Sequence, residues 1–271
     1  MKTFDDKVAV ITGAGSGIGR ALALDLAHRG ARLALSDIDV DAVTETQILC
    51  EKAGARTESY RVDVSDRRAV HAHADAVADE FGQVNLVFNN AGVALGADVV
   101  DMTWDDFEWV MNIDFWGVAN GTKAFLPALI ESGDGHLVNV SSVFGLMGIP
   151  GQSAYNSAKF AVRGFTEALR QEMRIARHPV GVSCVHPGGI KTNIVANARG
   201  MNDLGSHDEV ARRFEQIAMT TPTRAAKVIL AGVEKNKPRI LIGPDARGFD
   251  LIPRIVGPRY QDILAPLNRM G

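Results

Sequence analysis

Short apolar runs alternate with longer segments of helical period along almost the whole chain. Between the runs, apolar side chains return at the three- and four-residue spacing of a helix face, as Val70, Ala74 and Val77 do. Strands that alternate with helices are typical of a parallel sheet with helices on both faces. The pattern predicts an α/β fold with seven strands, at residues 7–12, 31–36, 56–62, 84–89, 136–141, 180–186 and 239–242.

The pattern shows no boundary between two domains. The 271 residues fit one large domain, and we find no linker, internal repeat or low-complexity segment, so residues 1–271 are expected to form a single domain. Two segments interrupt the alternation. Residues 190–221 are too long for an ordinary connection and are predicted to form a substrate lid. Residues 243–271 form a C-terminal extension whose four prolines argue against a long helix and whose apolar side chains need a surface to cover.

The composition excludes several classes of protein. With 29 basic and 32 acidic side chains the net charge is −3, which argues against a nucleic-acid partner. No apolar stretch predicts a membrane span, and the acidic residues near the N-terminus are unlike a signal peptide. Cys50 and Cys184 lack the spacing of a disulfide framework, and no cysteine or histidine cluster predicts a metal. We expect a cytoplasmic protein in which His71 and His73 are solvated and His186 is packed.

A glycine loop follows the first expected strand and opens the first helix. It reads Thr12-Gly13-Ala14-Gly15-Ser16-Gly17-Ile18-Gly19. Between a strand and a helix, glycines let the backbone approach a pyrophosphate, whose charge then meets the free N–H groups of the helix. No Gly-Lys-Ser/Thr ending indicates a triphosphate site. The loop therefore predicts a doubly wound Rossmann domain that binds a dinucleotide.

An acidic residue at the end of the second expected strand indicates which dinucleotide is bound. Asp37 lies eighteen positions beyond Gly19, where a carboxylate accepts hydrogen bonds from the adenosine ribose. A ribose phosphate would meet that carboxylate with its own negative charge, and the loop supplies no positive charge. Arg20, just after the loop, is the one reservation. We expect NAD rather than NADP.

Further motifs follow the later strands. They are Asp63-Val64, Asn89-Asn90-Ala91-Gly92, Asn112, Ser141-Ser142, Tyr155 with Lys159, and Pro187-Gly188 with Thr192. Taken in this order with the glycine loop, they show that the chain resembles the short-chain dehydrogenase/reductase family over nearly its whole length. The resemblance implies an oxidoreductase that acts on an alcohol or ketone, and a homodimer or homotetramer formed through the long helices around 104–132 and 152–177.

The same resemblance assigns roles residue by residue. Ser142 would orient the substrate oxygen, Tyr155 would exchange its proton, and Lys159 and Asn112 would serve a proton relay, with Asn112 holding a water. The implied cofactor contacts are Gly13, Gly15, Ser16, Gly17, Ile18, Gly19, Asp37, Asp63, Val64, Asn90, Ala91, Gly92, Tyr155, Lys159, Pro187, Gly188, Ile190 and Thr192.

The Tyr155 and Lys159 pair has a physical reading of its own. Residues four apart share a helix face, so the ammonium of Lys159 can approach the phenol. A unit charge at about 5 Å contributes roughly 3 kcal/mol at an effective dielectric near 20, or about two pKa units. We therefore expect Lys159 to move the pKa of Tyr155 from about 10 toward neutrality, so that Tyr155 acts as a general acid or base.

The substrate is indicated only by the apolar character of the candidate pocket walls. They are Val143, Leu146, Met147, Ile149, Ile194, Met201, Leu204, Phe214 and Met219. This favours a lipophilic alcohol or ketone of steroid, terpenoid or retinoid type. One alternative is a 3-oxoacyl thioester reductase; another, of a different class, is a non-catalytic dinucleotide sensor. Attachment of the apolar tail to a membrane surface is a third alternative.

Overall fold

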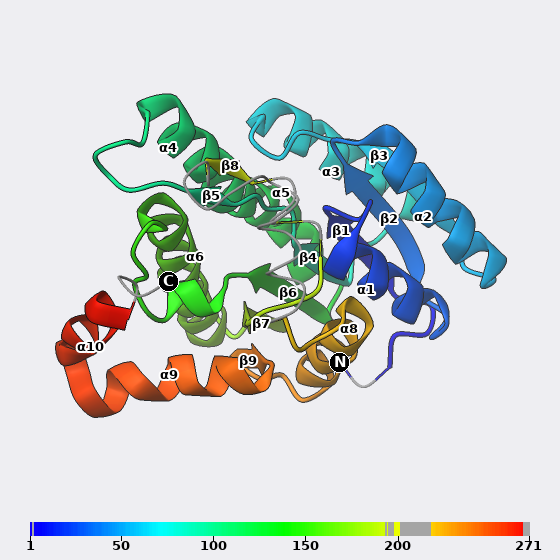
Figure 1. Cartoon of the computed structure of the whole chain (residues 1–271). Helices are drawn as coiled ribbons and strands as arrows, with labels where there is room; N and C mark the ends of the chain where they lie inside the picture. The colour runs from blue at the N-terminus through cyan, green and yellow to red at the C-terminus, as the bar shows by residue number, and fades with distance from the viewer. Residues whose placement is uncertain (2, 193, 195–197, 201–217, 268–271) are drawn as a thin grey trace.

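One parallel sheet of seven strands organises the protein. The computed structural model describes residues 1, 3–192, 194, 198–200 and 218–267. The strands run in the order β3-β2-β1-β4-β6-β7-β9 (Figure 1). Their bounds are β1 Val8–Thr12, β2 Arg32–Asp37, β3 Thr57–Arg61, β4 Leu86–Asn89, β6 Gly135–Val140, β7 Val180–Pro187 and β9 Arg239–Ile242. All seven expected strands are present, with ends that differ by one or two residues, and the predicted fold class is confirmed.

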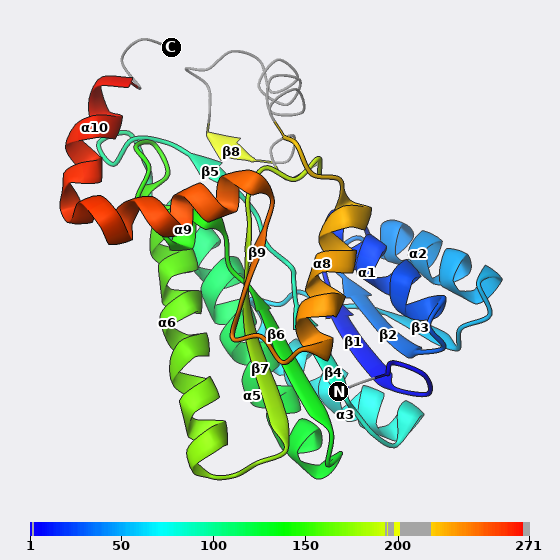
Figure 2. The same ribbon diagram turned by 90° about the horizontal axis from the view of Figure 1, so that it is seen from below.

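Helices cover both faces of this sheet. They are α1 Gly17–Ala27, α2 Val40–Lys52, α3 Arg67–Phe81, α4 Trp104–Met111, the π-helical turn η1 Asn112–Trp116, α5 Gly117–Glu131, η2 Val143–Gly145, α6 Ser153–Ile175, α8 Pro222–Glu234, α9 Pro244–Val256, η4 Gly257–Arg259 and α10 Tyr260–Leu267. α1, α2 and α8 lie on one face, and α3, α5 and α6 on the other (Figure 2).

The strands supply an apolar side chain to each face in turn. In β1, Ala9 and Ile11 pack toward α1 and α8, whereas Val8 and Val10 pack toward α3 and α5. Successive side chains of a strand point to opposite faces, so a strand buried on both faces is a continuous apolar run. This is why the strands could be predicted from short apolar stretches.

The topology fixes where a ligand can bind. The chain runs from β1 outward to β3 and then returns to β4 on the other side of β1. In open parallel sheets the carboxyl ends of the strands at such a reversal leave a crevice. The glycine loop after β1 and the segment after β4 meet at that reversal.

Part of the expected lid lies outside the described residues. Positions 193, 195–197 and 201–217 are among these, and with them the candidate pocket residues Met201, Leu204 and Phe214. The described flanks contain a small sheet that was not expected, in which β8 Arg199–Gly200 pairs with β5 Leu95–Gly96. Two-residue strands are too short to produce a periodic pattern. Met219 is 65% exposed.

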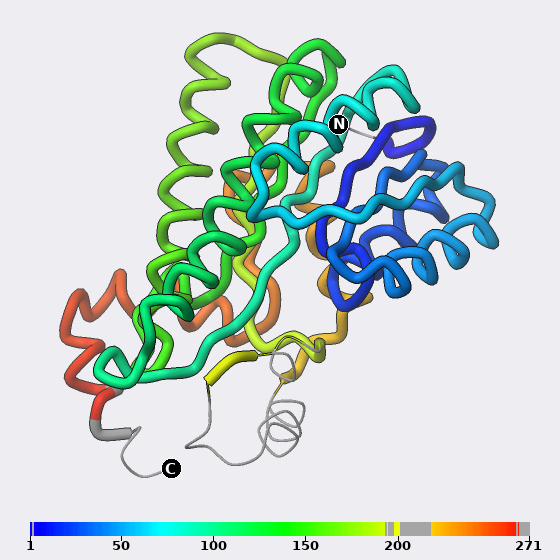
Figure 3. The backbone as a smooth tube through the Cα atoms, turned by 90° about the horizontal axis from the view of Figure 1, so that it is seen from above, coloured from blue at the N-terminus to red at the C-terminus, as the bar shows by residue number. Residues whose placement is uncertain are grey.

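The C-terminal extension is more helical than its prolines indicated. α9 runs for 13 residues: Pro244 stands at its start, where a missing N–H costs nothing, Pro253 lies within its last turn, and Pro258 follows only after its end. The extension covers the segment after β6 on the side remote from α2 and α3 (Figure 3). Phe249 packs 6.1 Å from Phe144, and the Tyr260 hydroxyl accepts a hydrogen bond from the Gly148 N–H at 3.1 Å. Within the described residues, no helix combines the length and apolarity needed to cross a membrane.

Candidate active site

The glycine loop is packed too tightly for side chains at Gly13, Gly15 and Gly19. A Cβ at Gly19 would lie 2.1 Å from the carbonyl oxygen of Gly13, and one at Gly13 would lie 2.8 Å from Cα of Ala91. Gly13 also has a φ of +65°, in the left-handed region that side chains disfavour. The loop can therefore bring bare backbone against a ligand while remaining in contact with the segment after β4.

The N-terminus of α1 is open to an anion. Ser16 stands at the N-cap position, yet its side chain makes no capping hydrogen bond, and the first turn contains no acidic residue. The first N–H groups of a helix have no partner within the helix and carry partial positive charge. These groups, with the glycines before them, fit the pyrophosphate of a dinucleotide.

Asp37 lies beside the glycine loop, as predicted. Its Oδ2 accepts the Gly15 N–H at 2.9 Å and its Oδ1 accepts the Asp39 N–H at 3.1 Å. Arg20, the reservation about cofactor choice, is already engaged. Its guanidinium donates to the Gly15 carbonyl at 2.6 Å and to Glu45 at 2.7 Å. A ribose phosphate would thus meet a carboxylate and an arginine that is paired with another acid.

The segment after β4 is hydrogen bonded to the start of the glycine loop. Thr12 Oγ1 accepts the N–H groups of Asn90 at 3.0 Å and Ala91 at 3.1 Å, and the Asn90 side chain donates to the Thr12 carbonyl at 2.9 Å. Gly92 continues this segment toward the catalytic residues, because a Cβ there would lie 3.3 Å from Nζ of Lys159. Asn90, Ala91 and Gly92 therefore lie between the glycine loop and the catalytic residues, and Asn90 ties the two loops together.

The remaining predicted cofactor contacts lie at two places on the same edge of the sheet. Asp63 accepts both the N–H and the hydroxyl of Ser65, at 2.9 and 2.7 Å, and Val64 is buried. Pro187 ends β7, and a Cβ at Gly17 would lie 3.1 Å from Cγ2 of Thr192. Thr192 therefore contacts the glycine loop across the crevice. Gly188 and the buried Ile190 connect Pro187 to Thr192.

Ser142, Tyr155 and Lys159 come together at the carboxyl end of β6. Ser142 caps η2 by accepting the Phe144 N–H at 3.1 Å, and its side chain faces Tyr155, whose pKa it lowers. Lys159 is 3% exposed; its Nζ lies 5.4 Å from the Tyr155 ring centre and donates to the Val140 carbonyl at 3.3 Å. Ser141 turns away, as expected, and its hydroxyl donates to the Lys159 carbonyl at 2.8 Å.

The fourth member of this cluster differs from the one that the sequence indicated. Asn112 is exposed, and the structure does not bring it to Lys159. Asp114, two residues later, is fully buried, and its Oδ2 lies 3.1 Å from Nζ of Lys159. A turn of π-helix joins α4 to α5 here, so the side-chain directions depart from those of a regular helix. Asp114 therefore takes the position that we had expected for Asn112.

The electrostatics of Tyr155 also differ from the expectation. Burial of the phenol raises its pKa, the charge of Lys159 and the hydrogen bond from Ser142 lower it, and the charge of Asp114 raises it; the net effect is a raised pKa. The expected fall toward neutrality is wrong for the chain alone. That expectation included the positive charge of Lys159 but not the negative charge of Asp114, which offsets it.

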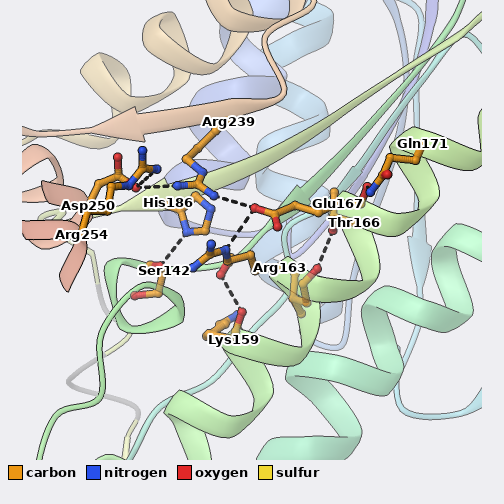
Figure 4. Close-up of polar contacts among 12 residues, drawn as sticks. Ser142, Lys159, Arg163, Thr166, Glu167, Gln171, His186, Arg239, Asp250 and Arg254 are labelled. Carbon is orange, nitrogen blue, oxygen red and sulfur yellow. Dashed lines mark hydrogen bonds and ion pairs between the residues drawn. The ribbon is translucent and has the colours of Figure 1, made fainter. Parts of the chain in front are cut away.

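Two further residues contact the site and were missed or only partly understood. His186 on β7 is fully buried, and its Nδ1 donates to the Ser142 carbonyl at 2.9 Å (Figure 4). Burial lowers the pKa of His186 to about 4, so the ring is neutral. Asp245, at the start of α9, accepts the Gly189 N–H at 2.7 Å in the loop beyond β7. Asp245 belongs to the C-terminal extension, so no spacing in the sequence linked it to that loop.

An ionic network joins the extension to the helix of Tyr155. Arg239 on β9 contacts Asp250 of α9 and Glu167 of α6, both at 2.6 Å, and Glu167 also contacts Arg163 at 3.0 Å (Figure 4). Burial raises the pKa of Glu167, but the hydrogen bonds from Arg239 and Arg163 outweigh it and lower that pKa overall. The network holds α6, the helix of Tyr155 and Lys159, against β9 and α9.

The chain is similar to known proteins over its whole length. A family model described as short chain dehydrogenase matches residues 7–203. The oxidoreductase SadH of Mycobacterium tuberculosis is 55% identical over 98% of this chain and 96% of its own length. Estradiol 17-beta-dehydrogenase 11 of Mus musculus is 31% identical over 97% of this chain and 84% of its own length.

A solved structure agrees with these relatives. A short chain dehydrogenase/reductase from Burkholderia phymatum in complex with NAD has a TM-score of 0.88 and 33% sequence identity, and the match covers 97% of this chain and 96% of that one. The glycine loop, the order of the strands and the Ser142, Tyr155 and Lys159 cluster agree with these likenesses. The protein is an oxidoreductase that belongs to the short-chain dehydrogenase/reductase family.

Proposed function

We propose that the protein is an NAD-dependent dehydrogenase that interconverts a lipophilic secondary alcohol and its ketone. The observation that carries the proposal is the cluster of Ser142, Tyr155 and the buried Lys159 at the carboxyl end of β6. A hydroxyl donor, a titratable phenol and a cation next to a dinucleotide crevice are the groups that proton transfer to or from a substrate oxygen requires.

Each group has a defined task. When bound, NAD supplies an acceptor or donor for the hydride at the substrate carbon. Tyr155 takes the hydroxyl proton of an alcohol or gives a proton to a carbonyl oxygen, and Ser142 holds that oxygen by a hydrogen bond. His186 fixes the Ser142 backbone through its carbonyl. The glycine loop, the N-terminus of α1 and Asp37 would hold the cofactor, with Thr192 on the opposite side.

Two observations support NAD over NADP. Asp37 ends β2 beside the glycine loop, where a carboxylate would face the adenosine ribose, and Arg20 is engaged with the Gly15 carbonyl and Glu45. The related structure from Burkholderia phymatum contains NAD. The lipophilic substrate rests on the apolar surroundings of Tyr155, with the Phe144 ring 6.1 Å away, and on the steroid named for the mouse relative. Val143, Leu146 and Met147, on the segment after β6, are buried.

A turnover assay tests the proposal. We expect reduction of NAD with a panel of lipophilic secondary alcohols, and a fall of about 10²- to 10⁴-fold in kcat for Tyr155→Phe with NAD affinity retained. Binding of NAD without turnover of any alcohol or ketone would favour the non-catalytic sensor. Turnover of 3-oxoacyl thioesters with NADPH alone would favour the thioester reductase.

We also propose a homodimer or homotetramer in the cytoplasm. The helices that the family resemblance placed at the interface carry exposed aromatic side chains, Trp116 at 46% and Phe160 at 41%. Light scattering coupled to size exclusion should give a mass of two or four chains; a mass of one chain would refute this.

A further inference from the structure

Asp114 is a buried acid in the catalytic cluster, and both of its carboxylate oxygens have a defined contact. It is fully buried, its Oδ1 accepts the Val93 N–H at 2.8 Å, and its Oδ2 lies 3.1 Å from Nζ of Lys159. The contact with Lys159 is an ion pair rather than a well-aligned hydrogen bond, because this oxygen has no hydrogen-bond partner of good geometry. An acid buried to this degree stays charged only beside a positive partner.

Two acidic groups near Lys159, the Asp114 carboxyl and the Tyr155 hydroxyl, therefore compete for its positive charge. Its Nζ faces Asp114 on η1 and lies 5.4 Å from the ring centre of Tyr155, one turn earlier on its own helix. With Asp114 ionised, the pair is neutral, and a phenolate at Tyr155 would be a second negative charge in a buried site. Removal of the carboxylate would leave the phenolate as the counterion of Lys159.

We propose that Asp114 competes with the ionised Tyr155 hydroxyl for the positive charge of Lys159 and so raises the pH at which Tyr155 gives up its proton. Asp114 acts through Lys159 and touches no reacting atom, so it is a positioning residue. The inference rests on the acid/base role proposed above for Tyr155. It follows that the enzyme is set to donate a proton to a ketone at neutral pH, and that alcohol oxidation increases as the pH rises.

The other titratable groups around the cluster are either neutral over the relevant range or paired with one another. On β7, burial raises the pKa of the Cys184 thiol to about 12 and lowers the pKa of His186 to about 4, so both are neutral between these values. On α6, Glu167 and Arg163 pair with each other and with Arg239 of β9. Among the described residues, the charges that act on the Tyr155 hydroxyl are those of Lys159 and Asp114.

Ultraviolet titration of tyrosine ionisation tests this without any substrate. The chain has three tyrosines, so the difference between the protein and its Tyr155→Phe variant isolates Tyr155. We expect a midpoint above the ordinary value of about 10. In Asp114→Asn, measured against the Asp114→Asn/Tyr155→Phe double variant, the midpoint should fall by about one to two pH units, the size of one charge removed from a buried site.

Asp114→Asn preserves the size of the side chain and an oxygen for the Val93 N–H, so the fold should be retained. Asp105→Asn, which removes an exposed acid from the first turn of α4, is the matched control and should leave the midpoint unchanged. An unchanged or raised midpoint in Asp114→Asn would overturn the proposal. So would a midpoint below about 10 in the unmodified protein, a result that depends on no variant of Asp114.

The pH dependence of turnover gives a second readout. With an alcohol that is oxidised in the panel, the rise of kcat with pH should move down by the same one to two units in Asp114→Asn. A merely structural role would lower kcat at every pH and leave the midpoint in place, which would contradict the proposal. Absence of turnover with every substrate would refute the proposed function, whereas the titration would still decide the role of Asp114.

Discussion

Asp37 and Asp114 are acids at opposite ends of the site, and they are held in different ways. Asp37 is partly exposed at the end of β2, and its carboxylate accepts backbone N–H groups from the adjoining β1–α1 loop and from its own turn. Asp114 is fully buried, and it meets the Val93 N–H and the side chain of Lys159, 45 positions further along the chain. Asp37 is thus held by the backbone of its own β–α–β unit, and Asp114 by a side chain on a distant helix that only tertiary packing brings to it.

This difference affects how each end responds to substitution. Backbone contacts within one β–α–β unit depend on glycines and on turn geometry, so a small change of shape should abolish binding. Contacts between distant side chains depend on charge in a buried environment, so a change of charge without change of shape should move a titration. The predictions below test each half of this contrast.

The largest effect is expected for Gly19→Ala at the cofactor end. The new methyl would lie 2.1 Å from the Gly13 carbonyl oxygen, so the loop that faces the pyrophosphate must move. We expect NAD affinity, measured by calorimetry, to fall at least about 100-fold, or roughly 3 kcal/mol. Gly164→Ala is the control, because nothing lies within 4 Å of a Cβ there. Wild-type affinity in Gly19→Ala would contradict the assigned role of the loop.

A smaller effect is expected for Asp37→Ser, which removes a charge and the acceptor of the Gly15 N–H but introduces no clash into the loop. Loss of hydrogen bonds from the ribose hydroxyls to a charged acceptor should weaken NAD by about 10- to 100-fold. NADP should lose less affinity or gain some, since its phosphate no longer meets the carboxylate. Titration of both cofactors checks this, with Asp41→Asn on the exposed first turn of α2 as control. An unchanged ratio of the two affinities would show that Asp37 does not select the cofactor.

The same contrast explains how much of the molecule could be predicted from its sequence. Strands, the glycine loop and Asp37 are local features, and each was placed within a residue or two. Ser142, Tyr155 and Lys159 were assigned because the order of the motifs resembles a known family, and Tyr155 and Lys159 also share one helix face. Asp114 was missed because Asn112, a more familiar relay residue, lies two positions away, and nothing local shows which of the two side chains a π-helical turn directs inward.

The C-terminal extension was harder still. Its apolar content indicated that it covers something, but only the fold shows that Phe249 and Tyr260 cover the segment after Ser142. Asp245, which accepts the Gly189 N–H, gives no sign of this role in the sequence, because its partner is 56 positions away. Contacts of this kind arise from the packing of β9 and α9 at the sheet edge.

The smallest predicted effect compares two histidines on one helix, His71 and His73 of α3. Both were expected in solvent, but only His71 is exposed. His73 is 4% exposed between Tyr60 and Phe125, with no hydrogen-bond partner for either ring nitrogen among the described residues. Burial lowers its pKa to about 4, against about 6.5 in an unfolded chain. The unfolded state therefore binds more protons between these values, and stability is lost as the pH falls from about 6.5 toward 4.

Replacement of this one ring should remove its share of the acid sensitivity. As the pH falls through this range, His73 should cost the unmodified protein up to roughly 1.4 kcal/mol of stability per pH unit. His73→Phe should not show this part of the loss when both proteins are unfolded with urea at a series of pH values. His71→Gln, two residues away in solvent, should leave the slope unchanged. Equal slopes in His73→Phe and the unmodified protein would mean that His73 becomes protonated without unfolding. Local sequence treats these two histidines alike, and only their packing against β3 and α5 separates them.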